Sequence, residues 1–260
     1  MNNIERVFQE EEKALIPYIC AGDPDLETTE ELIFTLKEAG ADIIELGIPF
    51  SDPLADGPVI QAAGQRALEE DVTLVDILDM VERISDEVKI PLVLMGYYNS
   101  VLNYGREKFA EDCARCGVSG VIIPDLPYEE DEKLYKNLND RGVNGIMLAA
   151  PNTPSDRLSF LGDKSKGFLY CVSLLGVTGD ERGPYERLDE YIGRVRDRVK
   201  LPLGLGFGID GPEKAAAVSQ YVDGIIMGSA IIEVIKDSQN AEEMHKNVGE
   251  FVAEIKEAIV

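Results

Sequence analysis

Short apolar runs recur along the chain, and each is followed by a turn and by a segment with helical periodicity. The eight runs are rich in Ile, Val and Leu, as parallel strands buried on both faces are: ALIPYICAG, DIIELG, PLVLMGYY, GVIIPD, NGIMLAA, GFLYCVS, PLGLGFG and DGIIMGS. Segments between them, such as ETTEELIFTLKEAG, space their apolar residues along one face of a helix, and several end at Gly. Eight β/α units predict one α/β domain over residues 1–260, a (β/α)8 TIM barrel.

An open, doubly wound sheet is the alternative to a closed barrel. Eight regular units without a reversal favour closure. Residues 2–12 precede the first unit and have helical character, so we expect an extra N-terminal helix that covers the bottom of the barrel.

Composition and charge narrow the classes of function. The formal net charge of -24 disfavours binding to nucleic acid, because phosphate backbones repel such a chain. No apolar run approaches the length of a membrane span, and the start MNNIERVFQEEE lacks the layout of a signal peptide. These features predict a cytoplasmic protein that does not act at a membrane.

The cysteine and histidine content disfavours two kinds of chemistry. Cys113 and Cys116 form a single C-x-x-C without a second pair or a nearby His, so a structural role is favoured over a redox pair or half a metal site. The only histidine, His245, lies in a polar C-terminal helix far from any motif, which disfavours a histidine base.

The last two strands end in glycine-rich turns that suit a phosphate group. Gly206, Gly208 and Gly211 match G-x-G-x-x-G, but the dinucleotide fingerprint belongs on the first turn of an open sheet. In a barrel the loops after strands seven and eight form the recurrent phosphate site, which points to Gly208, Gly228 and Ser229. No Lys or Arg lies in either turn, so we expect backbone amides to hold the anion; tight turns without a ligand are the alternative.

The loop GVTGDERGP follows the sixth strand and is long for a connection of this kind. Its glycines at positions 176, 179 and 183 suit a lid that closes over a ligand, and an ordinary surface loop is the alternative.

Three acids stand together in ELGIPFSDPLADGP. Glu45 shares a strand face with Ile43, while the apolar Ile44 and Leu46 share the other, so Glu45 should point into the barrel mouth with a raised pKa. Asp56 lies just before a helix that starts near Pro58, and the helix dipole there favours its ionised form.

This separation suits acid–base chemistry between Glu45 and Asp56, with Asp52 holding the turn. A magnesium site is the competitor, and it is disfavoured because Pro49 and Pro53 keep the acids from converging. A Schiff-base mechanism is also disfavoured, since no Lys stands at the C-terminal end of a strand.

These motifs carry a family resemblance. ELGIPFSDPLADGPVIQ, together with PYICAGDP, LLGVTG, GFGI and MGSA, resembles the α subunits of tryptophan synthase over essentially the whole chain. The resemblance implies a lyase that cleaves indole-3-glycerol phosphate to indole and glyceraldehyde 3-phosphate in a retro-aldol reaction, without a metal or an organic cofactor. It also implies catalytic roles: Glu45 moves protons to indole C3 and from the glycerol hydroxyl, Asp56 holds the indole N–H, and Tyr170 supports both.

The same resemblance implies further site residues. The phosphate-binding positions would be Gly179, Phe207, Gly208, Gly228 and Ser229. Thr178 matches a lid threonine that touches the catalytic aspartate, and Tyr18 matches a pocket aromatic that is usually Phe. The partner would be a pyridoxal-phosphate β subunit in an αββα complex, contacted by Tyr97, Asn99, Asp125 and Pro127.

Two alternatives remain beside this lyase. Indole-glycerol-phosphate synthase is a related barrel, but it needs a lysine in the barrel mouth that this chain lacks. A non-catalytic barrel subunit that only binds and activates a partner enzyme is the other, and it would not need Glu45, Asp56 and Tyr170 together.

Overall fold

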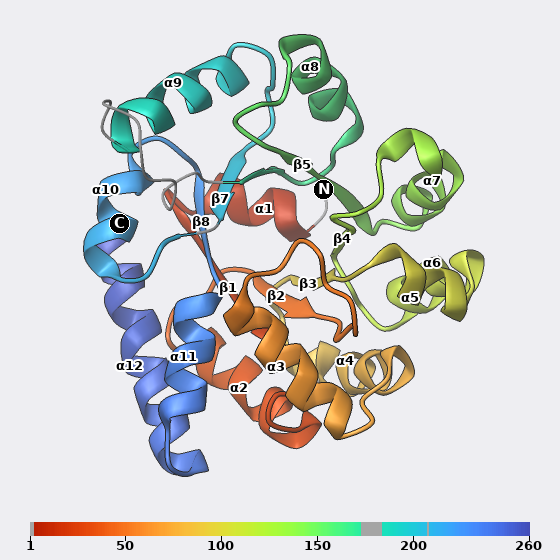
Figure 1. Ribbon diagram of the computed structural model, residues 1–260, viewed down its shortest axis with the longest axis vertical. Coiled ribbons are helices and arrows are strands. Elements are labelled where there is room, and N and C mark those ends of the chain that lie inside the picture. The colour runs from red at the N-terminus through yellow and green to blue at the C-terminus, as the bar shows by residue number, and fades with distance from the viewer. Residues whose placement is uncertain (1–2, 173–183, 207) are drawn as a thin grey trace.

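Eight parallel strands close into a barrel in the order of the sequence (Figure 1). The computed structural model describes residues 3–172, 184–206 and 208–260. The strands are β1 (Ala14–Cys20), β2 (Ile44–Gly47), β3 (Leu92–Met95), β4 (Gly120–Ile122), β5 (Asn144–Ala149), β6 (Leu169–Val172), β7 (Leu203–Gly206) and β8 (Gly224–Met227). Each of the eight apolar runs therefore contains a strand, and the predicted closed barrel is confirmed.

Helices surround the barrel on all sides (Figure 1). They are α1 (Asn3–Glu10), α2 (Leu26–Glu38), α3 (Pro58–Glu69), α4 (Leu74–Val88), α5 (Tyr98–Tyr104), α6 (Arg106–Arg115), the 3-10 helix η1 (Tyr128–Glu130), α7 (Glu132–Asp140), α8 (Ser155–Lys164), α9 (Pro184–Arg196), α10 (Pro212–Ser219), α11 (Ser229–Asp237) and α12 (Ala241–Ile259). None of the helices in this described part of the chain is both long and apolar enough to cross a membrane.

The core has two layers, which follow from the alternation of side chains along each strand. Ile43 belongs to the inner layer inside the barrel, whereas Ile44 and Leu46 belong to the outer layer under the helices. Glu45 lies between these two outward residues and therefore points into the barrel, as the sequence predicted.

Helix α1 closes the N-terminal end of the barrel, as predicted for the segment before the first unit. Ile4 is fully buried in the inner core layer, and Phe8 packs on Phe168 with ring centroids 5.6 Å apart. Figure 1 shows α1 crossing behind the strands. This arrangement leaves the C-terminal mouth as the open end.

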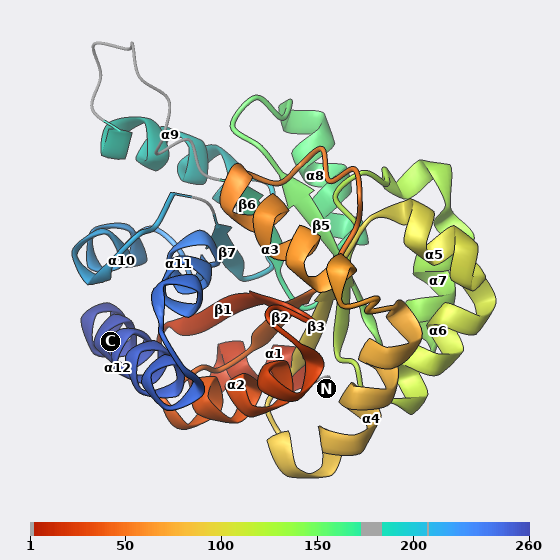
Figure 2. The ribbon, with the colours of Figure 1, turned by 60° about the horizontal axis from the view of Figure 1, so that its bottom comes forward.

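Helix α3 is held across the mouth by an ion pair between a half-buried arginine and a buried carboxylate. Arg66 of α3 donates two hydrogen bonds of 2.7 Å to the carboxylate of Asp23, which lies in the loop after β1. The Asp23 side chain is only 1% exposed. Figure 2 shows α3 on the side of the barrel away from α1. The pair fixes the helix that begins just after Asp56.

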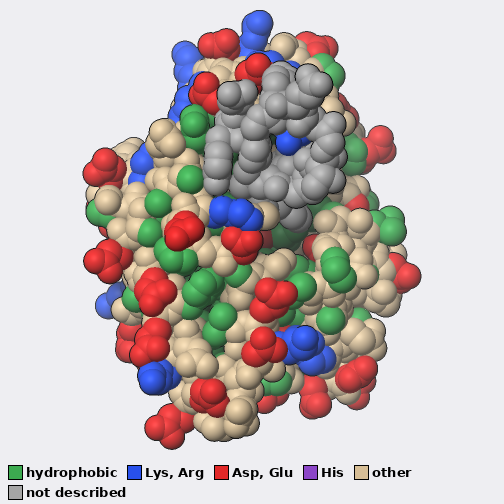
Figure 3. Space-filling view, turned by 60° about the vertical axis from the view of Figure 1, so that its left-hand side comes forward, with side chains coloured by type: hydrophobic (Ala, Val, Ile, Leu, Met, Phe, Trp, Pro, Cys, Tyr) green, Lys and Arg blue, Asp and Glu red, His purple; other side chains and the backbone are tan. Residues whose placement is uncertain are grey.

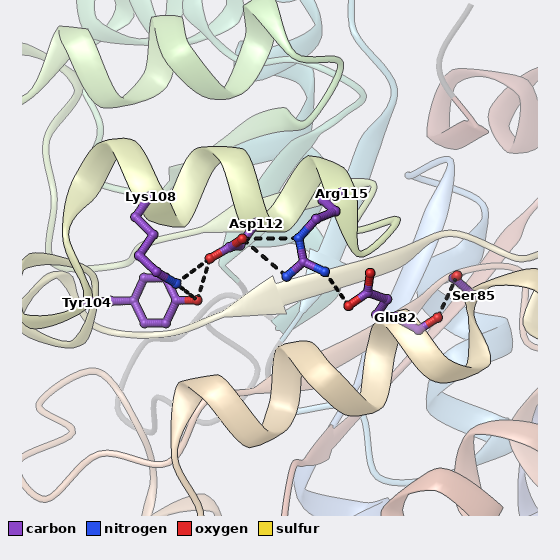
Figure 4. A network of polar contacts seen from close by, with 6 residues as sticks. All are labelled: Glu82, Ser85, Tyr104, Lys108, Asp112 and Arg115. Carbon is purple, nitrogen blue, oxygen red and sulfur yellow. Dashed lines mark hydrogen bonds and ion pairs between the residues drawn. The ribbon is translucent and has the colours of Figure 1, made fainter.

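Helices α4 and α6 are joined on the outside by a chain of polar contacts (Figure 4). Asp112 accepts hydrogen bonds from the Tyr104 hydroxyl at 2.6 Å and from Lys108 at 2.5 Å, and Arg115 bridges Asp112 to Glu82 of α4. The hydrogen bond from Lys108 is the main reason that the pKa of Asp112 is lowered to about 2. This network lies far out on the barrel wall and supports the packing of neighbouring helices.

The remaining polar and sulfur groups singled out by sequence lie away from the mouth. Cys113 and Cys116 are free and fully buried in the outer core layer, and burial raises the pKa of both thiols. His245 of α12 contacts Thr35 and Glu31 of α2. Acidic side chains are spread over the α10–α12 side of the molecule and are not gathered into one patch (Figure 3).

Candidate active site

A cavity of about 250 Å³ opens at the C-terminal mouth of the barrel. Its wall combines residues from β1, β2, β3, β6 and β8 with residues from the loops that follow β2, β7 and β8. The lining residues are Tyr18, Glu45, Asp56, Ile60, Met95, Tyr170, Gly208, Ile209, Asp210, Lys214, Ile226, Gly228, Ser229, Ala230 and Glu233. The cavity therefore brings together seven of the residues predicted from sequence: Tyr18, Glu45, Asp56, Tyr170, Gly208, Gly228 and Ser229.

Glu45 is buried at the floor of this cavity with an unsatisfied carboxyl group. Its residue exposure is 1%, and neither carboxyl oxygen has a hydrogen-bond partner among the residues that the structure describes. Burial, and to a smaller extent the negative charge of Asp56, raises the pKa of Glu45 to about 8. A carboxyl group with this pKa can both give and take a proton near neutral pH.

Asp56 lies in the loop after β2, two residues before α3 begins at Pro58, with Gly57 as the N-cap. One oxygen of its carboxylate, Oδ2, accepts a hydrogen bond of 3.0 Å from the Tyr97 hydroxyl. Burial raises the pKa of Asp56, and the Tyr97 hydrogen bond opposes that rise. The hydrogen bond from Tyr97 therefore favours the ionised form of Asp56, whereas burial opposes it.

Tyr97 is placed by the structure beside the cavity and not on an exposed surface. Its side chain is buried, its hydroxyl accepts a hydrogen bond of 2.9 Å from the Ala55 amide, and its ring stacks on Phe50 at 5.1 Å. Sequence reasoning missed this contact because Tyr97 and Asp56 are 41 positions apart.

Asp52 is exposed and lies outside the cavity wall. Its carboxylate accepts a hydrogen bond of 2.6 Å from the Ser51 hydroxyl, while its backbone carbonyl accepts the Leu54 amide at 3.0 Å. The backbone, and not the side chain as expected, therefore makes the turn contact.

Two tyrosines reach the mouth because glycines stand on the neighbouring strands. A Cβ atom on Gly47 would overlap the Tyr18 hydroxyl, and one on Gly206 would lie 2.7 Å from Tyr170 Cζ. Burial is the main cause that raises the pKa of both phenols, with Glu45 and Asp56 adding to it. Both hydroxyls therefore keep their protons at neutral pH.

The opposite side of the cavity suits an anion. Gly208 has φ +79°, a conformation that favours glycine, and Ser229 is the first residue of α11, after Gly228. Helix N-termini carry partial positive charge and free amides. Lys214 of α10 also lines this side and forms a 2.6 Å ion pair with Asp210.

Lys214 was not recognised from sequence as part of the site. It belongs to the first turn of α10, three residues beyond the last glycine of the motif, Gly211. A cationic residue at this position changes the expectation that backbone amides alone would hold the anion.

The other residues predicted from sequence either lie outside the cavity or are not among the residues that the structure describes. Asn99, Asp125 and Pro127 are exposed, and Asp125 accepts a 2.9 Å hydrogen bond from the Tyr98 amide, which ties the loop after β3 to the loop after β4. Thr178, Gly179, Phe207 and the predicted lid over residues 176–183 lie outside the described residues. No group of three or more His, Cys, Asp or Glu that could hold a metal ion occurs within residues 3–172, 184–206 and 208–260.

Comparisons with known proteins agree with this geometry. The model of the family described as tryptophan synthase alpha chain matches residues 4–260. The tryptophan synthase alpha chain of Petrotoga mobilis is 51% identical over 257 residues, which cover 98% of this chain and 99% of that protein. That of Caldanaerobacter subterraneus subsp. tengcongensis is 48% identical over 263 residues, covering both chains fully. The crystal structure of tryptophan synthase subunit alpha from Legionella pneumophila superposes with a TM-score of 0.92 at 37% identity, covering 100% of this chain and 98% of that chain.

Proposed function

The chain belongs to the tryptophan synthase alpha chain family, lyases that cleave indole-3-glycerol phosphate to indole and glyceraldehyde 3-phosphate, and we propose that its mouth cavity is the site of this reaction. One observation carries the proposal. Glu45 is a buried carboxyl group without a hydrogen-bond partner among the described residues, and it shares the cavity with Asp56. Burying such a group costs folding free energy. A buried acid with a raised pKa in a cavity is therefore a candidate for catalysis and not for stabilising the fold.

The two acids divide the chemistry between them. Protonated Glu45 gives its proton to indole C3, and Asp56 accepts the ring N–H and stabilises the positive charge on the ring. Glu45, now a carboxylate, takes the proton of the hydroxyl on the carbon attached to C3. The C=O bond of the aldehyde then forms, the carbon–carbon bond breaks, and its electron pair restores the aromatic indole. Glu45 ends the cycle protonated, as it began.

Substrate orientation follows from the two sides of the cavity. We assign the phosphate to Gly208, Gly228 and the N-terminus of α11 at Ser229, with Lys214 nearby, and from the family resemblance also to Gly179 and Phe207. The indole then lies toward Asp56, near the apolar side chains of Ile60 and Met95. Tyr170 borders the reacting carbon, and Thr178 would act from the loop. No metal or organic cofactor takes part in this scheme.

The test is steady-state release of indole from indole-3-glycerol phosphate. Glu45→Gln removes proton transfer and keeps the shape of the side chain, so we expect activity to fall by orders of magnitude while substrate binding persists. Gly208→Asp adds bulk and negative charge at the anion side and should raise KM. Turnover of Glu45→Gln close to that of an active unmodified chain would reject the mechanism. An unmodified chain that binds substrate and never releases indole would instead favour a subunit that only activates a partner.

We propose further that the chain works with a tryptophan synthase β subunit in an αββα assembly in the cytoplasm, as one domain over residues 1–260. Three exposed residues suit the contact: Asn99 in the first turn of α5, and Asp125 and Pro127 in the loop after β4. Leu54 supports a contact at this mouth, since 94% of this apolar residue is exposed in the loop that carries Asp56.

Purified β subunit should therefore increase the rate of indole release. Asn99→Lys should weaken that increase and leave the rate of the chain alone unchanged. Gln239→Lys, an equivalent change at an exposed site between α11 and α12, is the control. Equal activation of both variants would remove Asn99 from the contact.

A further inference from the structure

The Tyr18 side chain spans the cavity from the phosphate side to the catalytic side. Its stem lies against Gly228, where an added Cβ atom would be 3.1 Å from Tyr18 Cδ1. Its hydroxyl lies over Gly47, two residues beyond Glu45 on β2. Tyr18 and Glu45 are also direct partners in the parallel pairing of β1 and β2. The tip of the phenol therefore lies on the path between the two ends of a bound substrate.

The Tyr18 hydroxyl is a free hydrogen-bond donor within the described part of the chain. It makes no hydrogen bond to any described residue, although its ring is partly buried and packs on the core. Neither oxygen of Glu45 has a described partner. Both groups border one cavity and do not bond each other, so a substrate oxygen can lie between the Tyr18 hydroxyl and the Glu45 carboxyl group.

We propose that the Tyr18 hydroxyl donates a hydrogen bond to the substrate oxygen that becomes the aldehyde oxygen of the product. This inference rests on the proposed function of Glu45, because it concerns the same hydroxyl that Glu45 deprotonates. As the proton moves to Glu45, negative charge develops on that oxygen before the C=O bond is complete. A fixed donor stabilises this charge in the transition state more than in the bound substrate.

Two other roles for the hydroxyl fit the geometry less well. A hydrogen bond to Glu45 would tune the carboxyl group, but the structure shows no such bond. A purely structural hydroxyl would bond another side chain or a backbone group, as the Tyr135 hydroxyl does with the Leu126 carbonyl at 3.0 Å and the Tyr191 hydroxyl with the Ala149 carbonyl at 2.8 Å. Tyr18 has no such bond to the described residues.

The experiment compares Tyr18→Phe with the unmodified full-length chain in cleavage of indole-3-glycerol phosphate. The change removes one oxygen and keeps the ring. Tyr221→Phe is the control, since Tyr221 lies before β8 at the closed end of the barrel. We expect kcat of Tyr18→Phe to fall by about tenfold to a hundredfold with KM within about twofold, because the lost bond acts in the transition state. Condensation of indole with glyceraldehyde 3-phosphate should slow by the same factor.

A substrate analogue separates this role from simple binding. 3-Indolylpropyl phosphate has the ring and the phosphate but no chain hydroxyls, so its affinity should be the same for Tyr18→Phe and the unmodified chain. An unchanged kcat, a loss confined to KM, or equal weakening of analogue binding would overturn the proposal. A shifted pH midpoint with an unchanged maximal rate would also overturn it, by showing that the hydroxyl acts on Glu45. If the unmodified chain itself releases no indole, the proposed function fails first.

Discussion

The Tyr97 hydroxyl donates a 3.0 Å hydrogen bond to Asp56 Oδ2 while it accepts a 2.9 Å hydrogen bond from the Ala55 amide. The Tyr97 hydroxyl is thus fixed both as a donor and as an acceptor, and its ring stacks on Phe50. This contact orients the Asp56 carboxylate and favours its charged form.

Tyr97→Phe removes only the donor, so we expect the pKa of Asp56 to rise, because the hydrogen bond that favours its charged form is lost. Asp56 would then be protonated at a higher pH than before. The acidic limb of the pH profile of kcat/KM should move upward by the same amount. Tyr98→Phe is the matched control, because the Tyr98 hydroxyl bonds Asp131 and not a catalytic group. Identical pH profiles for the two variants would exclude this role of Tyr97.

The raised pKa of Glu45 predicts a pH-dependent cost in stability. Burial, aided by the charge of Asp56, raises the pKa to about 8 in the folded state from 4.5 in the unfolded chain. Between these values the folded protein holds a proton that the unfolded chain has lost, so the free energy of unfolding should fall as pH rises from about 4.5 to about 8 and level off above.

Glu45→Gln mimics the protonated side chain at every pH and should remove this fall. At pH 9 we expect the variant to be more stable than the unmodified chain by about 4–5 kcal/mol, and at pH 4 nearly equal. Urea denaturation at the two pH values measures the difference. A constant difference between the proteins across this range would contradict the assigned pKa.

Much of the fold and part of the site can be read from the sequence. The apolar runs locate all eight strands because a buried parallel strand needs continuous apolar residues, and strand alternation alone orients Glu45. Contacts between distant segments cannot be read in this way. The bond from Tyr97 to Asp56, the position of Lys214 beside the anion side and the pairing of Asp23 with Arg66 all depend on how helices and loops settle on the closed barrel.

The roles of glycines in the strands also could not be predicted from the sequence. Gly206 matches a dinucleotide fingerprint that does not suit the seventh strand of a barrel, and the sequence offered no other role for it; in the structure it makes room for the Tyr170 ring. We expect Gly206→Ala to displace that ring and to lower kcat/KM by about tenfold or more, since small misplacements at a site are costly. Gly64→Ala in α3 is the matched control: nothing lies within 4 Å of its added Cβ atom, so activity should persist and stability should rise by about 0.5–1 kcal/mol. Steady-state kinetics and thermal melting compare the two. Full activity of Gly206→Ala would show that the Tyr170 position tolerates the shift.

The last prediction concerns the contribution to stability of the ion pair between Arg66 and the buried carboxylate of Asp23. Arg66→Met keeps most of the side-chain bulk and leaves the Asp23 carboxylate buried without its ionic partner, so we expect the free energy of unfolding to fall by about 3–5 kcal/mol. Removing both charges in Asp23→Leu with Arg66→Met should cost less than Arg66→Met alone, because no charge is then stranded. Arg6→Met, which breaks an exposed pair with Glu10, should change stability by less than about 1 kcal/mol. Denaturant unfolding of the single and double variants gives the coupling between the two residues. If the effects of the two substitutions on the free energy of unfolding were additive, the pair would stabilise α3 no more than a surface ion pair does. Tyr97 would then be the contact that fixes Asp56.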